Sequence, residues 1–221
     1  LVVGFEEKLE FIDLCRGIAH AGHVPYEDFV YSSKYLEGAM LTYLRRKGLV
    51  APNKPADRRE RMEALKESGS EKFIGAYVKA PIVGKYDWIY DLDLTSLYPS
   101  IIMTLNISPE AKVGKVQDWD ANKFVKGEVD TYRIGEDTIT KENLKKYLEQ
   151  SKFSIASNGV LYRTDKVGCI PGILNLWFDK RVEYKNEMKK YGKAGDKEKY
   201  AFYHKRQLVQ KILLNSLYGV L

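Results

Sequence analysis

Apolar residues in the first fifty positions recur every three or four residues, which is the period of an amphipathic helix. They predict one helix over residues 5–22 and a second over residues 34–47. Gly48 follows the second run and favours a helix end there, because glycine readily adopts the left-handed conformation. Residues 51–70 are rich in proline, lysine, arginine and glutamate, so they are predicted to form a linker with a short polar helix at 57–67.

The pattern then changes to that of β-strands. Residues 73–79 and 86–94 are rich in β-formers and flank a turn at Pro81 and Gly84. Residues 98–105 predict a short helix with a proline in its first turn.

Short elements are predicted in the middle of the chain as well. Residues 112–134 predict further strands, and residues 141–150 predict a helix with Thr140 as its N-cap. The dipeptide Asn158-Gly159 lies between two β-rich runs, which is a strong hairpin pattern.

Two long helices are predicted from residue 172 to the end. Residues 191–196 connect them, and a connection this short requires an antiparallel helical hairpin. One stripe of the second helix carries His204, Gln207, Lys211, Asn215 and Tyr218. The opposite side carries Val209, Ile212, Leu213, Ser216 and Leu217. The stripe could be an ordinary solvated face, but its cation, amides and aromatic ring without any acid favour a surface that binds a phosphate and a base.

The first long helix has a matching pair of cations. Arg181 and Lys185 are four residues apart, with Trp177 and Met188 on the same stripe. Two cations at this spacing repel one another unless they share an anionic ligand. If the hairpin brings both stripes together, Arg181, Lys185 and Lys211 surround a space of polyphosphate size. The alternative is a pair of ordinary surface cations.

A predicted strand, turn and helix at 86–105 places Asp93 at the end of the strand and beside a helix N-terminus. A carboxylate beside free backbone N–H groups can hold Mg²⁺ and phosphate at one point. The alternative is an aspartate that caps the turn. Asp91 lies on the same strand face and is interpreted as a polar strand residue rather than as a second ligand.

Composition indicates which kinds of partner and site the chain is expected to have. The chain of 221 residues carries a formal net charge of +6, which favours a polyanion such as nucleic acid. Cys15 and Cys169 have no Cys or His neighbours at metal-ligand spacing, so neither a zinc site nor a disulfide scaffold is expected. No apolar run approaches the roughly 18 residues of a membrane span. The first residue is not Met, so we expect a piece of a longer protein.

Two segments carry a family resemblance. Asp-Leu-Thr-Ser-Leu-Tyr-Pro-Ser at 93–100 resembles motif A of family B DNA polymerases. Lys-x-x-x-Asn-Ser-Leu-Tyr-Gly at 211–219 resembles their motif B, and the order is that of the family. Residues 105–110 are similar to the phage-type continuation of motif A, and residues 177–181 are similar to the family's fingers helix. The likeness is greatest to polymerases of large tailed phages.

The resemblance implies an α+β fold. We expect a helical connector and linker at 1–70, the N-terminal part of the palm at 71–171, and fingers helices ending in motif B at 172–221. The partial palm should contain an antiparallel sheet bearing Asp93, and the fingers should be a two-helix antiparallel hairpin. In the family, the second metal carboxylate lies in an Asp-x-Asp element (motif C) after motif B. No Asp-Thr-Asp is found in this chain, nor are the thumb and exonuclease motifs.

The resemblance also implies roles for the residues of motif A. Asp93 is expected to bind both catalytic Mg²⁺ ions, with the carbonyl of Leu94 completing one metal shell. The N–H groups of Ser96 and Leu97 are expected to contact the triphosphate. Tyr98 should lie beneath the sugar and exclude a 2′-hydroxyl, which selects deoxynucleotides.

Further roles fall on the fingers and on one glycine. Arg181, Lys185 and Lys211 are expected to hold the β- and γ-phosphates, and Asn215 to contact the incoming nucleotide. Tyr218 and Gly219 should pack against the nascent base pair. Gly75 lies in Phe-Ile-Gly-Ala, where the family has Tyr-x-Gly-Gly/Ala, and it is expected to contact the template. The phenylalanine of this segment keeps the aromatic ring of the family's tyrosine but lacks its hydroxyl.

The activity implied is transfer of a deoxynucleotide from dNTP to a primer 3′-hydroxyl by a two-metal mechanism. The expected partners are primer-template DNA, dNTP and the remainder of the polymerase, in the cytoplasm of a phage-infected bacterial cell. This piece alone is expected to be inactive. Two alternatives stay open: a non-catalytic nucleotide- or DNA-binding module, and one half of a split polymerase.

Overall fold

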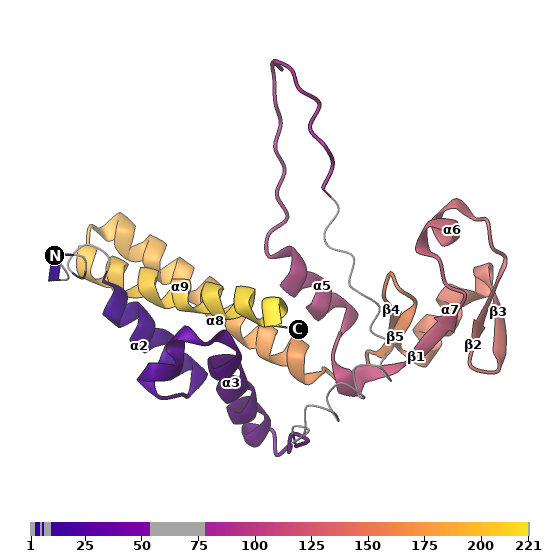
Figure 1. Ribbon diagram of the computed structural model, residues 1–221, viewed down its shortest axis with the longest axis horizontal. Helices are drawn as coiled ribbons and strands as arrows, with labels where there is room; N and C mark the ends of the chain where they lie inside the picture. Colours follow the sequence, from indigo (N-terminus) through magenta and orange to yellow (C-terminus); the bar gives the residue numbers. More distant parts are fainter. Residues whose placement is uncertain (1–2, 5, 7–9, 54–77, 221) are drawn as a thin grey trace. The chain divides into compact units, whose positions relative to one another are not determined.

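The computed structural model describes residues 3–4, 6, 10–53 and 78–220 (Figure 1). The chain divides into two compact units, one made of residues 1–49 and 96–221 and the other of residues 50–95. The first unit contains helices and an antiparallel sheet, which confirms the predicted α+β class.

The N-terminal helices are α2 (Phe11–Gly22), the 3-10 helix η1 (Tyr26–Val30) and α3 (Ser32–Arg46). The predicted end of α3 is confirmed, since Gly48 has φ 69°. The N–H of Gly48 donates to the carbonyl of Arg45 at 3.1 Å, and the N–H of Leu49 donates to that of Leu44 at 2.9 Å. This pair of bonds is the glycine-dependent C-cap that satisfies the last carbonyls of a helix.

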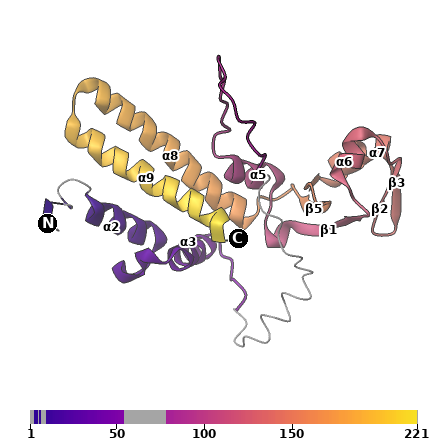
Figure 2. The same ribbon diagram turned by 45° about the horizontal axis from the view of Figure 1, so that its top comes forward.

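The helical hairpin is confirmed as well. Helices α8 (Cys169–Ala194) and α9 (Lys197–Val220) run antiparallel and side by side in Figures 1 and 2. Gly195 ends α8 with φ 74°, so the chain reverses within two residues. The rings of Tyr191 and Tyr203 stack at 5.5 Å and 4° near this reversal.

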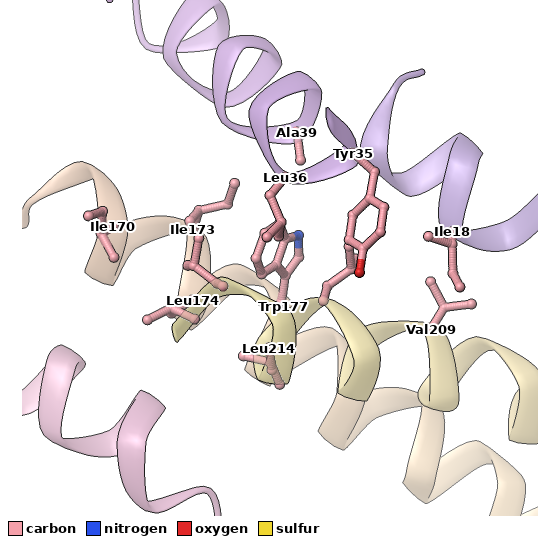
Figure 3. Packing of buried hydrophobic residues seen from close by; sticks show 12 residues of the cluster. Ile18, Tyr35, Leu36, Ala39, Ile170, Ile173, Leu174, Trp177, Val209 and Leu214 are labelled. Carbon is pink, nitrogen blue, oxygen red and sulfur yellow. The ribbon is translucent and has the colours of Figure 1, made fainter. Parts of the chain in front are cut away.

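The main core lies where α2 and α3 pack on the α8–α9 hairpin (Figure 3). Trp177 is only 5% exposed and shares this core with Leu36 and Leu214. Gly172 allows a close approach of α3 and α8, because a Cβ there would lie 2.2 Å from the hydroxyl oxygen of Tyr43. Trp177 shares a helix stripe with Arg181, as predicted, but its side chain is buried and does not extend the cationic surface. An indole buries a large apolar area and packs inward, although it lies only about 40° around the helix from Arg181.

The sheet has the order β3-β2-β1-β5-β4, and all of its pairs are antiparallel. Its strands are β1 (Lys112–Gln117), β2 (Thr131–Ile134), β3 (Asp137–Thr140), β4 (Phe153–Ile155) and β5 (Val160–Arg163). The Asn158-Gly159 hairpin between β4 and β5 is confirmed, with Gly159 at φ 82°. A second core gathers Val116, Leu144 and Leu161.

Two short helices accompany the sheet, α6 (Ala121–Lys126) and α7 (Lys141–Ser151). Helix α7 was predicted, although Thr140 makes no side-chain cap bond to it. Helix α6 interrupts the stretch predicted as strands. Its N-cap is Asp120, whose carboxylate accepts the N–H of Asn122 at 2.8 Å and thereby favours a helical first turn.

The second unit differs from the prediction for residues 86–94. These residues form no strand, and the five-stranded sheet does not contain Asp93. Trp88 is 100% exposed and Tyr90 is 85% exposed. A β-strand is stabilised by pairing with a neighbour and by packing of its faces, and a β-rich pattern provides neither by itself. The predicted helix at 57–67 and most of the predicted strand at 73–79 lie outside the described residues.

None of the helices in the described parts of the chain combines the length and the apolar character needed to cross a membrane.

Candidate active site

The predicted helix after motif A is present as α5 (Leu97–Leu105). Ser96 precedes it in the left-handed conformation with φ 52° and makes no side-chain cap bond. Pro99 lies buried in the first turn, where a helix does not use its N–H. Asp93 and Leu94 are exposed and belong to the second unit.

One aromatic contact joins the two motif segments. The rings of Tyr98, at the start of α5, and Tyr218, near the end of α9, stack with their centroids 4.7 Å apart and their planes 11° apart. Tyr98 is 51% exposed and Tyr218 is 37% exposed, so the pair lies at the surface. The structure therefore brings together two residues that are 120 positions apart in the sequence and that were both predicted as site residues.

The polar stripe of α9 is exposed along most of its length. Lys211, Asn215 and Tyr218 are exposed, whereas Gln207 is buried at 9% exposure. Gln207 was predicted on the ligand-binding stripe, but it is buried, because α9 is covered by α8 on one side and by α2 on another. The apolar side was predicted correctly, with Leu213 and Leu217 in the core.

The predicted cations of the hairpin have no acidic partners in the part of the chain that the structure describes. Among the described residues, no ion pair includes Arg181, Lys185 or Lys211. Lys190, by contrast, lies 3.3 Å from a carboxylate oxygen of Glu187. The Nε of Arg181 is buried and has no hydrogen-bond partner in the described part of the chain. These three cations are thus available to an anionic ligand.

Asn106 links the end of α5 to the segment that enters α8. It is 7% exposed and lies at φ 56°, as the C-cap of α5. Its Nδ2 donates to the carbonyls of Arg163 at 2.6 Å and Lys166 at 2.9 Å, and its Oδ1 accepts the N–H of Gly168 at 2.8 Å. Sequence reasoning missed this residue, although an asparagine at the end of a helix is a known signal for a left-handed cap.

Ser108 and Glu110 complete this link at the start of α8. Glu110 accepts the N–H of Cys169 at 2.5 Å and the hydroxyl of Ser108 at 2.7 Å, and the Ser108 Oγ accepts the N–H of Ile170 at 3.3 Å. Burial opposes ionisation of Glu110, but these hydrogen bonds outweigh it and lower its pKa. Burial and the adjacent carboxylate raise the pKa of Cys169 to about 11, so its thiol stays protonated and is a poor nucleophile.

The described residues contain no group of three or more His, Cys, Asp or Glu side chains that could hold a metal ion. Asp93 and the carbonyl of Leu94 offer oxygen donors, which suit Mg²⁺, but they are only part of a coordination shell. Gly219 is exposed with open space around it, and Gly75 lies outside the described residues.

Comparison with known proteins adds to this geometry. Residues 30–221 match the model of DNA polymerase family B. The chain is similar to DNA polymerase 1 of Pyrococcus abyssi, with 32% identity over 220 residues, which are 98% of this chain and 23% of that protein. It is also similar to the DNA-directed DNA polymerase of Escherichia phage RB69, with 24% identity over 187 residues, covering 85% of this chain and 18% of that protein.

A solved structure shows the same fold. The family B DNA polymerase from the archaeon Pyrobaculum calidifontis matches with a TM-score of 0.62 and 24% identity, over 98% of this chain and 23% of that one. The chain is thus similar to archaeal polymerases as well as to a phage polymerase, so the resemblance is not restricted to phage proteins. The chain spans about a quarter of the length of the archaeal relatives named here.

Proposed function

Because the chain belongs to DNA polymerase family B, we propose that it is part of an enzyme that extends a primer 3′-hydroxyl with deoxynucleotides on a DNA template. The observation that carries this proposal is the contact between the two motif segments, the stacked rings of Tyr98 and Tyr218. The partners are primer-template DNA, dNTP and the remaining parts of the polymerase.

The triphosphate is held by the hairpin cations. Arg181, Lys185 and Lys211 have no acidic partners among the described residues, and each would gain a charge-assisted hydrogen bond from a phosphate oxygen. The side chain of Arg181 is partly buried, and its planar guanidinium loses less side-chain entropy per hydrogen bond formed than a lysine ammonium does. Asn215 lies one turn after Lys211 on the same exposed stripe, where it can contact the incoming nucleotide.

The start of α5 orients the nucleotide. The N–H groups of Ser96 and Leu97 lie at a helix N-terminus, where the helix dipole favours a phosphate. Tyr98 supports the deoxyribose and leaves no space for a 2′-hydroxyl, while Tyr218 and Gly219 face the nascent base pair. Gly75 contacts the template strand.

Asp93 and the Leu94 carbonyl are the oxygen donors that would hold Mg²⁺. When bound, two such ions activate the 3′-hydroxyl and neutralise charge on the pyrophosphate that leaves. The remaining ligands come from the nucleotide, from water and from a second carboxylate elsewhere in the polymerase. This chain by itself therefore binds nucleotide but does not catalyse the transfer.

The test is titration calorimetry of the 221-residue chain with a dNTP in the presence of Mg²⁺. Lys211→Ala and Arg181→Ala should each weaken binding about tenfold or more, since a hydrogen bond to a charged group contributes about 1.5–3 kcal/mol. The matched control is Lys145→Ala, because the side chain of Lys145 is 85% exposed on α7. Unchanged affinity in Lys211→Ala would overturn the phosphate assignment.

Primer extension by the same preparation tests the second half of the proposal. We expect no incorporation by the chain alone. Templated incorporation that is lost in Asp93→Asn would show that this chain holds a complete active site.

A further inference from the structure

Helix α5 is attached to the α8–α9 hairpin at both of its ends. At its start, the ring of Tyr98 stacks on that of Tyr218 near the end of α9. Beyond its other end, the side chains of Asn106, Ser108 and Glu110 hydrogen-bond to the segment that begins α8. A helix held at two points keeps one orientation, whereas a helix held at one point can pivot about it.

The attachment after α5 is also the N-terminal cap of α8. The N-cap residue of α8 is Gly168, which has no side chain that could accept a hydrogen bond. Glu110, which lies 59 positions away from Cys169, accepts the N–H of Cys169 instead, and the Ser108 Oγ accepts the N–H of Ile170. A carboxylate at a helix N-terminus is further stabilised by the helix dipole. The first turn of α8 is therefore bonded to the chain that leaves α5.

The two segments approach each other closely at this point. A Cβ on Gly168 would lie 2.6 Å from the Cβ of Ser108, and Ser108 is only 1% exposed. Glu110, in contrast, is exposed and is not part of either hydrophobic core. Its contribution therefore comes from its hydrogen bonds across the two segments and not from filling the interior.

Helix α8 extends the effect of this attachment to the proposed nucleotide site. Arg181 lies on α8 about 18 Å from Cys169 along the helix axis, at roughly 1.5 Å per residue. A tilt of α8 by about 5° relative to α5 would therefore move Arg181 by roughly 1.5 Å. Such a shift is large for a nucleotide that contacts both helices, because hydrogen bonds weaken within a few tenths of an ångström.

We propose that Glu110, together with Ser108, is a positioning residue for nucleotide binding. It holds α5 against α8, so that Tyr98 meets the sugar while the hairpin cations hold the β- and γ-phosphates. This inference rests on the function proposed above. Glu110 acts through the two helices and not through a contact with the nucleotide. If it only stabilised the fold, its removal would weaken the binding of every ligand to the same extent.

The test is titration calorimetry of the 221-residue chain with a dNTP, the matching rNTP and inorganic pyrophosphate, each with Mg²⁺. In Glu110→Ala, the affinity for dNTP should fall about fivefold or more, because binding must then also order α5. The affinity for rNTP should fall less, because the exclusion of the 2′-hydroxyl by Tyr98 is relaxed. The affinity for pyrophosphate should change less than about twofold, because the cations that bind it all lie on the hairpin.

Three further variants support the comparison. Glu110→Gln keeps an oxygen that can accept the N–H of Cys169, so it should restore most of the dNTP affinity. Ser108→Ala removes the acceptor of the Ile170 N–H with little change in volume, and it should reproduce the loss. Glu136→Ala is the matched control, because it removes the same charge from an exposed position between β2 and β3. It should change the affinity for all three ligands less than about twofold.

Two results would overturn the proposal. Equal losses for all three ligands in Glu110→Ala would mean that Glu110 only stabilises the fold. Unchanged dNTP affinity in this variant would mean that α5 needs no attachment at this end.

Lys211→Ala separates these results from a failure of the proposed nucleotide site. It should weaken dNTP and pyrophosphate alike, so unchanged affinity for both in Lys211→Ala would refute the phosphate assignment. The change in preference between dNTP and rNTP in Glu110→Ala tests the attachment of α5 independently of that assignment.

Discussion

Removing the side chain of Asn106 should destabilise the chain strongly, although this residue lies in no motif. Asn106→Ala deletes three hydrogen bonds, two to carbonyls and one from the buried N–H of Gly168. Each carbonyl bond contributes about 0.5–1.5 kcal/mol, and an unsatisfied buried N–H costs about 1–3 kcal/mol. The expected loss in the free energy of unfolding is therefore about 2–6 kcal/mol.

A second variant separates the hydrogen bonds from the backbone. Asn106 lies at φ 56°, where alanine is strained by about 1–2 kcal/mol and glycine is not. Glycine costs about 0.5–1 kcal/mol more than alanine through the entropy of the unfolded chain. Asn106→Gly should thus be destabilised as well, but by up to about 1.5 kcal/mol less than Asn106→Ala.

The assay is urea unfolding followed by circular dichroism, with an unchanged m-value as the condition for comparing variants. Hydrogen exchange of the Gly168 amide should be faster in both variants, which reports the network directly. Asn186→Ala is the matched control, because Asn186 is exposed on α8 and alanine favours a helix. A loss below about 1 kcal/mol in Asn106→Ala would refute the account of the network, and a glycine variant less stable than the alanine variant would refute the account of the backbone.

Three other expectations follow from the same contacts. Gly172→Ala should lower the free energy of unfolding by about 1–3 kcal/mol, because its Cβ would overlap a tyrosine hydroxyl of α3. Gly192→Ala is the control, since its Cβ would lie 3.2 Å from an exposed ring. It should change the free energy of unfolding by less than about 1 kcal/mol. The folded-state pKa of Glu110 is lowered, so its contribution to stability is present above its unfolded value of 4.5 and is lost as the pH falls through the lower folded value. Unfolding measured from pH 6 to pH 3 should show this loss in the parent chain and a smaller one in Glu110→Gln; equal pH profiles would contradict it. A double-mutant cycle of Tyr98→Ala and Tyr218→Ala should give a coupling energy of about 0.5–1.5 kcal/mol, and a value of zero would mean that the stack does not join the motif segments in solution.

Local patterns predicted the elements whose stability is local. The α8–α9 hairpin followed from helical periodicity and a glycine at the reversal, and Gly195 adopts the left-handed conformation there. The β4–β5 hairpin followed from Asn158-Gly159 for the same reason. The end of α3 at Gly48 is a third example, because its two capping bonds form between residues no more than five positions apart.

The motif segments at 93–100 and 211–219 also indicated the family, and the match over residues 30–221 confirms it. A motif names the residues of a site, but it does not place them. The roles of Asp93, Leu94, Gly75 and the other site residues are predictions.

Tertiary structure alone decided which faces are covered and which strands pair. Trp177 and Gln207 lie on stripes that carry polar residues in the sequence, yet both are buried. Helix periodicity predicts which residues share a face, but it does not predict which other element packs on that face. Residues 86–94 have a strand pattern but form no strand, since a strand depends on a partner that its own residues do not provide. The Asn106 network and the Tyr98–Tyr218 stack join residues 57 to 120 positions apart, and such contacts arise only when the folded chain brings distant segments together.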